Sequence, residues 1–250
     1  MTEKSKTTSG RSGGRAQRLI KRAAKPVINP CPPGQFGGMY KPLSQPDLEN
    51  IFDTALRLLS ELGMGEIPNR LRQDLLTAGA KDGEAGRVVF PRSLTEDAIA
   101  KAAKTFVLHG RDETRSIQVG GSKVYFGTGG AAVQTLDLDS GTYRPSTLSD
   151  LHNFTRLQDT LANVSWYTRC CVATDVPSNF DLDVNTAYAL LLNTTKPTAT
   201  SFTLAEYVAP IVKMLDIAAG GKGAFSKRPF MKAHISPVIS PMRYGEDAVD

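Results

Sequence analysis

The sequence has few cysteines, few histidines and no long apolar run. Its 250 residues include three histidines and three cysteines, namely Cys31 and the adjacent Cys170 and Cys171. Three cysteines without C-x-x-C spacing provide neither a disulfide framework nor a cysteine-rich zinc site. Neighbouring residues of a strand point to opposite faces, so we interpret Cys170 and Cys171 as packing residues. This cysteine usage fits a reducing compartment.

No segment approaches the roughly 18 apolar residues of a membrane span. The N-terminal segment also has too few apolar residues for the apolar region of a secretory signal. We therefore expect a soluble, cytoplasmic protein with no membrane partner.

Basic character is confined to the N-terminus. The net charge is +5, but the first 25 residues hold eight basic side chains and one acidic side chain, or +7, which leaves −2 for the remainder. A nearly neutral remainder gives no support for a nucleic-acid partner. We predict a basic disordered tail and a Pro- and Gly-rich extended arm over residues 1–40.

Helical and antiparallel patterns fill residues 41–122. Ser44 is expected to cap a helix that ends at Gly63, and the capping box formed by Ser93 and Glu96 predicts a later helix. Short β-runs separated by glycines predict a small antiparallel region, which continues to residue 143. The predicted buried face of the first helix carries Leu48, Ile51, Phe52, Ala55, Leu59 and Leu62.

Helix and strand alternate through the rest of the chain. Strands are expected to start near Val164, Pro197 and Pro229, about 32 residues apart, which is the length of a strand-helix-strand step in a parallel α/β protein. The uniform spacing favours a (β/α)8 barrel of the TIM type over a doubly wound sheet. Since only about four units fit, we predict that residues 123–250 form the first half of such a barrel.

The stretch Gly127–Ala132 has the G-x-G-x-x-A spacing of a dinucleotide-binding loop. A phosphate-binding loop must open a helix, because the helix N-terminus supplies the free N–H groups. Here a period-two pattern follows, and Asp139–Gly141 indicates a hairpin turn. We therefore interpret these glycines as easing close backbone approach, and an NAD(P)-dependent oxidoreductase is the least supported function.

Other catalytic motifs give little guidance. The histidines His109, His152 and His234 are far apart, and no P-loop, H-E-x-x-H motif or nucleophile elbow occurs. No protein-bound metal is predicted. Glu206 follows Thr203 by three residues and can equally serve as a capping-box partner. Candidate carboxylates for acid–base chemistry are Asp175, Asp181, Asp183 and Glu206.

An ordered series of segments resembles the trimethylamine methyltransferase (MttB-like) family. The series begins near Tyr40 and reaches the last residue, and it consists of "YKPLSQPDLENIFDTALRLLSELG", "LLTAGA", "RVVFPRSLTEDAIAKA", "FVLHGRDE", "VYFGTGGAAVQTLDLDSGTYRPSTLSDL", "TKPTATSF" and "KRPFMKAHISPVISPM". The resemblance implies a (β/α)8 barrel of which this chain covers the N-terminal half. Some members carry pyrrolysine in the second half, and many others are linked to quaternary amines such as glycine betaine.

The resemblance also implies a reaction and its partners. A methyl group would pass from a small methylated amine, of the trimethylamine or glycine betaine type, to the cobalt of a corrinoid (cobalamin). The corrinoid would be carried by a cognate partner protein. Homo-oligomer formation stays open, and no residue of this chain is assigned as the catalytic one.

In such a barrel the active site lies at the C-terminal ends of the strands. A methylated ammonium is recognised by aromatic faces and a nearby carboxylate. Only one of Trp166 and Tyr167 can point inward, and Arg169 can bind a betaine carboxylate as a bidentate fork. The expected substrate-binding residues are Trp166, Tyr167, Arg169, Phe202, Glu206, His234 and Ser236, with Ser201 and Ser240 at the same strand ends.

The corrinoid face would need close approach to the barrel mouth. Gly129 and Gly130, which lack side chains, are the expected contact residues. A second hypothesis treats the chain as a non-catalytic fragment or half-barrel subunit that pairs with a separate second half through its exposed strand edges.

Overall fold

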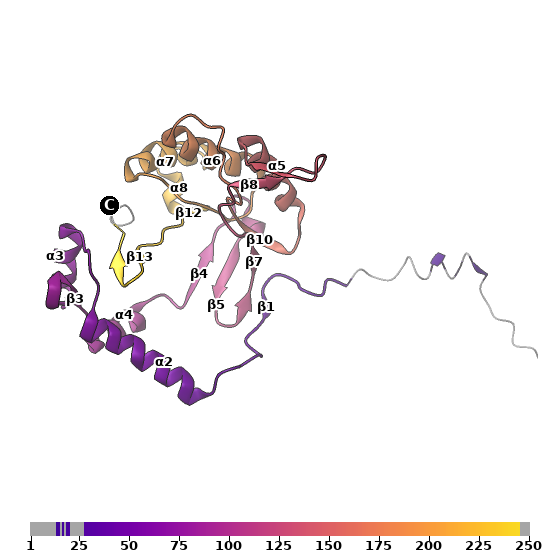
Figure 1. Cartoon of the computed structure of the whole chain (residues 1–250). Coiled ribbons are helices and arrows are strands. Elements are labelled where there is room, and N and C mark those ends of the chain that lie inside the picture. The colour runs from indigo at the N-terminus through magenta and orange to yellow at the C-terminus, as the bar shows by residue number, and fades with distance from the viewer. Residues whose placement is uncertain (1–13, 16, 18, 21–27, 246–250) are drawn as a thin grey trace, which may run out of the picture. The chain divides into compact units, whose positions relative to one another are not determined.

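A computed structural model (Figure 1) describes residues 14, 15, 17, 19, 20 and 28–245. The chain divides into two compact units, residues 1–32 and residues 33–250. Most of the predicted disordered tail lies outside the described residues. The described arm contributes strand β1 (Gln35–Phe36), which pairs antiparallel with β6 (Lys123–Val124).

Helix α2 (Gln45–Arg57) begins as the sequence predicts. The Ser44 hydroxyl accepts a hydrogen bond from the Asp47 N–H, and the Asp47 carboxylate accepts one from the Ser44 N–H, which completes a capping box. A π-helical turn, η1 (Leu58–Leu62), continues the helix to Gly63, whose φ of 71° ends it.

The predicted buried face of α2 is wrong. Of its residues, Leu48, Ile51, Phe52 and Leu62 are exposed, and within α2 only Leu56 is buried. Helix α4 (Arg92–Lys101) contacts α2 through an ion pair between Arg92 and Asp53 at 2.9 Å. A polar contact at this place leaves the apolar stripe uncovered.

The capping box predicted at Ser93 is also wrong. Helix α4 starts at Arg92 with Pro91 in the N-cap position, so the Ser93 hydroxyl lies inside the first turn. Glu96 instead accepts a hydrogen bond from Arg92 at 2.8 Å. The elements that precede α4 are α3 (Asn69–Thr77), β2 (Lys81–Asp82), η2 (Glu84–Gly86) and β3 (Val88–Val89).

The small antiparallel region is confirmed as separate two-stranded pairs. Strand β4 (Thr105–Leu108) pairs with β5 (Ile117–Gly120), with η3 (Glu113–Arg115) between them. Strand β8 (Gln134–Leu136) pairs with β9 (Tyr143–Pro145). A strand therefore follows the glycine-rich stretch, and the loop does not open a helix as a dinucleotide site would require.

The predicted alternation of helix and strand is confirmed as a mixed α/β fold with a parallel sheet. The strand order is β12-β11-β10-β7, so the four strands of this sheet lie side by side in the order in which they occur along the chain. A closed barrel is not present in the described residues. The strands are β7 (Phe126–Gly127), β10 (Val164–Thr168), β11 (Thr198–Thr200) and β12 (Met231–Ala233).

Helices connect these strands and cover one face of the sheet. The Thr147 hydroxyl and the Asp150 carboxylate form a second capping box at the first of these helices. The connecting elements are α5 (Leu148–Thr160), α6 (Asn179–Asn193), η4 (Ala205–Tyr207), α7 (Val208–Ala218) and α8 (Ala224–Lys227). The buried core shared by sheet and helices consists of Leu151, Tyr167, Cys171, Ala187, Ala189, Leu190, Ile211, Leu215, Phe230 and Met231.

The last parallel strand is only three residues long. Strand β12 ends at Ala233, and the apolar residues beyond it form a separate antiparallel pair, β13 (Val238–Ile239) with β14 (Arg243–Tyr244). Within the part of the chain that the structure describes, no helix combines the length and apolar content that crossing a membrane requires.

Candidate functional site

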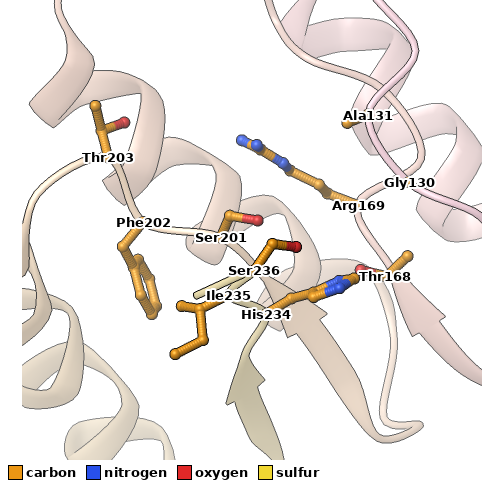
Figure 2. A pocket seen from close by; sticks show the side chains of 10 residues that line it. All are labelled: Gly130, Ala131, Thr168, Arg169, Ser201, Phe202, Thr203, His234, Ile235 and Ser236. Carbon is orange, nitrogen blue, oxygen red and sulfur yellow. The ribbon is translucent and has the colours of Figure 1, made fainter. Parts of the chain in front are cut away.

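A pocket of about 520 Å³ lies where the parallel strands end (Figure 2). Strands β10, β11 and β12 end at Thr168, Thr200 and Ala233, and the residues that follow form most of the wall. Carboxyl ends of parallel strands meet at one edge of a sheet, which brings distant segments together there. The lining residues are Gly130, Ala131, Thr168, Arg169, Ser201, Phe202, Thr203, His234, Ile235 and Ser236.

Arg169 places an unpaired cation in this pocket. Its side chain extends from the end of β10 toward the segment that carries Ser201 and Thr203 (Figure 2). Its backbone is fixed, because its N–H donates to the Ala199 carbonyl and its carbonyl accepts from the Ala131 N–H. No hydrogen bond or ion pair links its guanidinium to another described residue. Such a group can bind a carboxylate or phosphate through two parallel hydrogen bonds.

The segment after β11 forms the opposite wall. The buried carboxylate of Asp183 on α6 accepts hydrogen bonds from the Thr203 N–H and the Thr203 hydroxyl. The Phe202 ring is partly buried against the core and adds an apolar surface to the pocket. The capping box considered as an alternative role for Glu206 does not form, because Thr203 bonds to Asp183 instead.

The segment after β12 completes the wall. The His234 N–H donates to the Thr200 carbonyl at 2.8 Å and so continues the β11–β12 ladder past the strand end. Ile235 and Ser236 follow it into the pocket lining. This wall therefore offers one imidazole, one aliphatic side chain and one hydroxyl.

The glycine-rich stretch supplies the last side of the pocket. Ala131 has a φ of 71°, in the left-handed region that residues other than glycine rarely adopt. A Cβ added to Gly129 would meet nothing within 4 Å, and one added to Gly130 would make only ordinary contacts. Packing within this chain therefore does not explain either glycine.

Two of the expected aromatic residues lie elsewhere. Tyr167 is fully buried in the core, where its hydroxyl lies 3.1 Å from the Cys170 sulfur and its burial raises its pKa. Trp166 covers Gly127 on the neighbouring strand, and the Lys232 ammonium lies 4.9 Å from the centre of its ring. Neither residue lines the pocket.

Three further expected residues also fall outside the lining. Glu206 is exposed within η4, and Ser240 lies between β13 and β14. Gly129 precedes the lining segment without joining it. The structure therefore brings together six of the expected site residues, which are Gly130, Arg169, Ser201, Phe202, His234 and Ser236.

The remaining titratable candidates have structural contacts. The His152 ring nitrogen Nδ1 lies 2.7 Å from Asn193 Nδ2, which joins α5 to α6. Asp175 accepts a hydrogen bond from the Leu148 N–H at the start of α5, and Asp181 accepts one from its own helix cap, Ser178. Among the described residues, no group of three histidine, cysteine or acidic side chains is placed to hold a metal ion.

The packing role predicted for the adjacent cysteines is confirmed. Cys171 belongs to the buried core, and Cys170 packs against it. Sequence reasoning missed four lining residues, Ala131, Thr168, Thr203 and Ile235. Thr168 ends β10 and Thr203 follows Phe202, so each stands next to an expected residue, and this position was the available signal.

The chain was compared with known proteins. The sequence model of the family described as trimethylamine methyltransferase (MTTB) matches residues 11–250. Trimethylamine methyltransferase MttB from Desulfitobacterium hafniense is 28% identical over 201 residues. That match covers 80% of this chain and 40% of the relative, so the chain spans less than half of the relative's length.

Proposed function

Because this chain belongs to the trimethylamine methyltransferase (MTTB) family, we propose that it transfers a methyl group from a methylated amine to a corrinoid. The corrinoid is carried by a partner protein, and its cobalt supplies the nucleophile that accepts the methyl group. The chain's own task is to bind the amine, orient its methyl group and admit the partner.

The unpaired guanidinium of Arg169 is the observation that carries the choice of substrate. Trimethylamine has no anionic group and would leave this cation without a partner in the pocket. A carboxylate-bearing quaternary amine of the glycine betaine type would pair with it through charge-assisted hydrogen bonds. Ser201 and Ser236 also line the pocket, and their hydroxyls add hydrogen-bond donors.

The ammonium end of such a substrate needs an apolar or aromatic surface. A quaternary ammonium has no N–H to donate, and an aromatic face attracts it by roughly 0.5–2 kcal/mol. The Phe202 ring supplies that surface, with Ile235 beside it in the lining. Carboxylate and ammonium are thus held by different groups, which fixes the direction of the methyl carbon.

The reaction requires no acid or base from this chain. The bond between nitrogen and the methyl carbon breaks, its electron pair stays on nitrogen, and the product leaves as a neutral tertiary amine. No proton is needed by the leaving group. Binding and orientation by Arg169 and Phe202 therefore account for the part that this chain plays in the step.

The glycine-rich side of the pocket fits the approach of a large planar group. Side chains at Gly129 and Gly130 would cause no clash within the chain. Because both residues lack a side chain, a large group can approach the backbone closely here. These two residues are the proposed contact with the partner's corrinoid.

The proposal is tested with the full chain, glycine betaine and trimethylamine. Binding is measured by calorimetry, and demethylated product is measured by NMR in the presence of a reduced corrinoid. Arg169→Ala should weaken glycine betaine binding by about 10- to 100-fold, the loss of a charged hydrogen bond worth about 1.5–3 kcal/mol. Arg156→Ala, on the exposed side of α5, is the matched control and should bind normally. Absence of both binding and demethylation with either amine would contradict the proposal.

One observation favours a second candidate. Within the described residues, β7 and β12 are edge strands of the parallel sheet, and open edges pair readily with further strands. The chain would then be a half-barrel subunit whose site is completed by another polypeptide segment. Size-exclusion chromatography separates the two: a stable monomer that binds glycine betaine argues against this candidate, and obligate pairing supports it.

A further inference from the structure

Asp183 holds a buried carboxylate directly behind the pocket wall. The residue is 1% exposed, and its two oxygens accept hydrogen bonds from the N–H and the hydroxyl of Thr203, the latter at 3.1 Å. None of the described basic side chains forms an ion pair with it. A buried carboxylate without a counter-cation is costly, so its two bonds to Thr203 must compensate for much of its desolvation.

The segment that donates these bonds has few other hydrogen bonds, although its Phe202 ring packs against the core. Strand β11 ends at Thr200, and the ladder to β12 ends with the bond from the His234 N–H to the Thr200 carbonyl. Among the described residues, the N–H groups of 201–203 make no backbone–backbone hydrogen bond. The Thr203 N–H bonds to Asp183, which joins this segment to α6.

We propose that Asp183 is a positioning residue that fixes residues 201–203 so that Ser201 and Phe202 face the pocket. Asp183 does not line the pocket itself and acts through Thr203, which does. A segment already ordered before binding need not be ordered by the ligand, so the carboxylate raises the pocket's affinity by preorganisation. The link to affinity rests on the proposed function, whereas the ordering of the segment does not.

Asp183→Asn tests the ordering directly. The amide keeps the size of the side chain but offers one acceptor oxygen in place of two, so one of the two Thr203 donors loses its partner. Hydrogen exchange measured on the full chain reports on residues 201–203 through the Thr203 amide, the one of the three that donates a hydrogen bond among the described residues. Exchange there should accelerate about tenfold and should stay unchanged in α6. Asp181→Asn is the matched control, because it makes the same charge change on the same helix and contacts Ser178 instead.

Binding of glycine betaine, measured by calorimetry, provides the second readout. Asp183→Asn should weaken it about tenfold, and the matched control Asp181→Asn, which lies outside the pocket lining, should bind as the natural protein does. Should Asp183→Asn fail to fold, Thr203→Val carries the test, since it removes only the hydroxyl bond and should give a smaller acceleration in the same segment.

The outcomes separate the two proposals. Equal exchange of residues 201–203 in Asp183→Asn and Asp181→Asn overturns the positioning role, whatever the ligand does. Faster exchange spread over α6 and β11 also overturns it, because Asp183 would then support the fold as a whole. Faster exchange confined to residues 201–203, in a protein that never binds glycine betaine, keeps the positioning role and rejects the proposed substrate.

Discussion

The parallel sheet with its helices and the region of residues 44–120 bury their apolar side chains to very different degrees. In the first, Leu151, Leu190 and Ile211 are at most 1% exposed. In the second, Ile51 is 57% exposed, although it lies on a well-capped helix. Capping and periodicity therefore produce a helix in both regions, but only a neighbouring layer turns the apolar stripe into a core.

This difference locates the stability of the molecule. Buried apolar area contributes in proportion to the surface removed from water, so the sheet and its helices supply most of the folding free energy. Within residues 44–120 the buried apolar residues are five, namely Leu56, Met64, Ala80, Val88 and Ile117. The exposed ion pairs of this region contribute little each. Substitutions of the same chemistry should therefore have unequal effects in the two regions.

The largest expected effect is in the core. Leu190→Ala should lower the free energy of unfolding by about 3 kcal/mol, because it removes buried methyl groups and leaves a cavity. Leu192→Ala on the same helix is the control, since Leu192 is 56% exposed, and it should stay within about 0.5 kcal/mol. Urea titration measures both free energies of unfolding, and equal losses would show that burial does not set the stability difference.

The next effect concerns the half-buried capping box of α5. Asp150 accepts hydrogen bonds from the Arg144 guanidinium at 2.6 and 2.9 Å, which hold the pKa of its carboxyl well below the usual range. Asp150→Asn should cost about 2 kcal/mol at pH 7. Urea titration at several pH values measures this difference.

The pH dependence of that difference has a defined sign. Because folding lowers the pKa of Asp150, its carboxylate contributes fully above the unfolded pKa of about 3.9, and this contribution is lost as the pH falls toward the folded pKa. The gap between the natural protein and Asp150→Asn should therefore shrink below about pH 4. A gap that is constant down to pH 2 would contradict this assignment.

A smaller effect is expected for the exposed capping box of α2. Ser44→Ala removes the hydroxyl that accepts the Asp47 N–H and should cost about 1 kcal/mol. The corresponding Thr147→Ala in α5 should cost more, because that cap is half-buried and shares Asp150 with Arg144. Thermal unfolding of the two variants ranks them, and the reverse order would show that the N-terminal region carries the stability.

The smallest effect is expected on the uncovered stripe of α2. Ile51→Ala should change the unfolding free energy by less than about 0.5 kcal/mol, as surface substitutions usually do. A loss above about 1 kcal/mol would show that this face is covered in solution. The next question would be whether another copy of the chain covers it. Measuring the unfolding free energy at two protein concentrations separates contact between copies, which depends on concentration, from packing within one chain, which does not.

Sequence reasoning was most successful where a local rule decides the outcome. The cap at Ser44 and the stop at Gly63 depend on a few adjacent residues, and both were found. The burial of Leu48 and Ile51 depends on which element lies opposite, and periodicity does not contain that information. The predicted cap at Ser93 is wrong because the helix starts two residues earlier, with Pro91 in the N-cap position.

The pocket was predicted to a similar extent. The ends of parallel strands meet at one edge, and this rule grouped Arg169, Phe202, His234 and Ser236 in advance. The rule does not tell which strand residue faces the helices. Tyr167 was therefore expected in the pocket, but it lies in the core. Asp183 is 20 positions from Thr203 in the chain, and only the folded structure brings the two together.

The contact between Gly127 and Trp166 also restricts how this sequence can change over time. A Cβ at position 127 would lie 2.0 Å from an atom of the indole ring, so no other residue fits while the ring stays in place. Substitution at position 127 becomes tolerable only after a smaller side chain has replaced Trp166. Among descendants of this sequence the two positions should therefore vary together, in a fixed order.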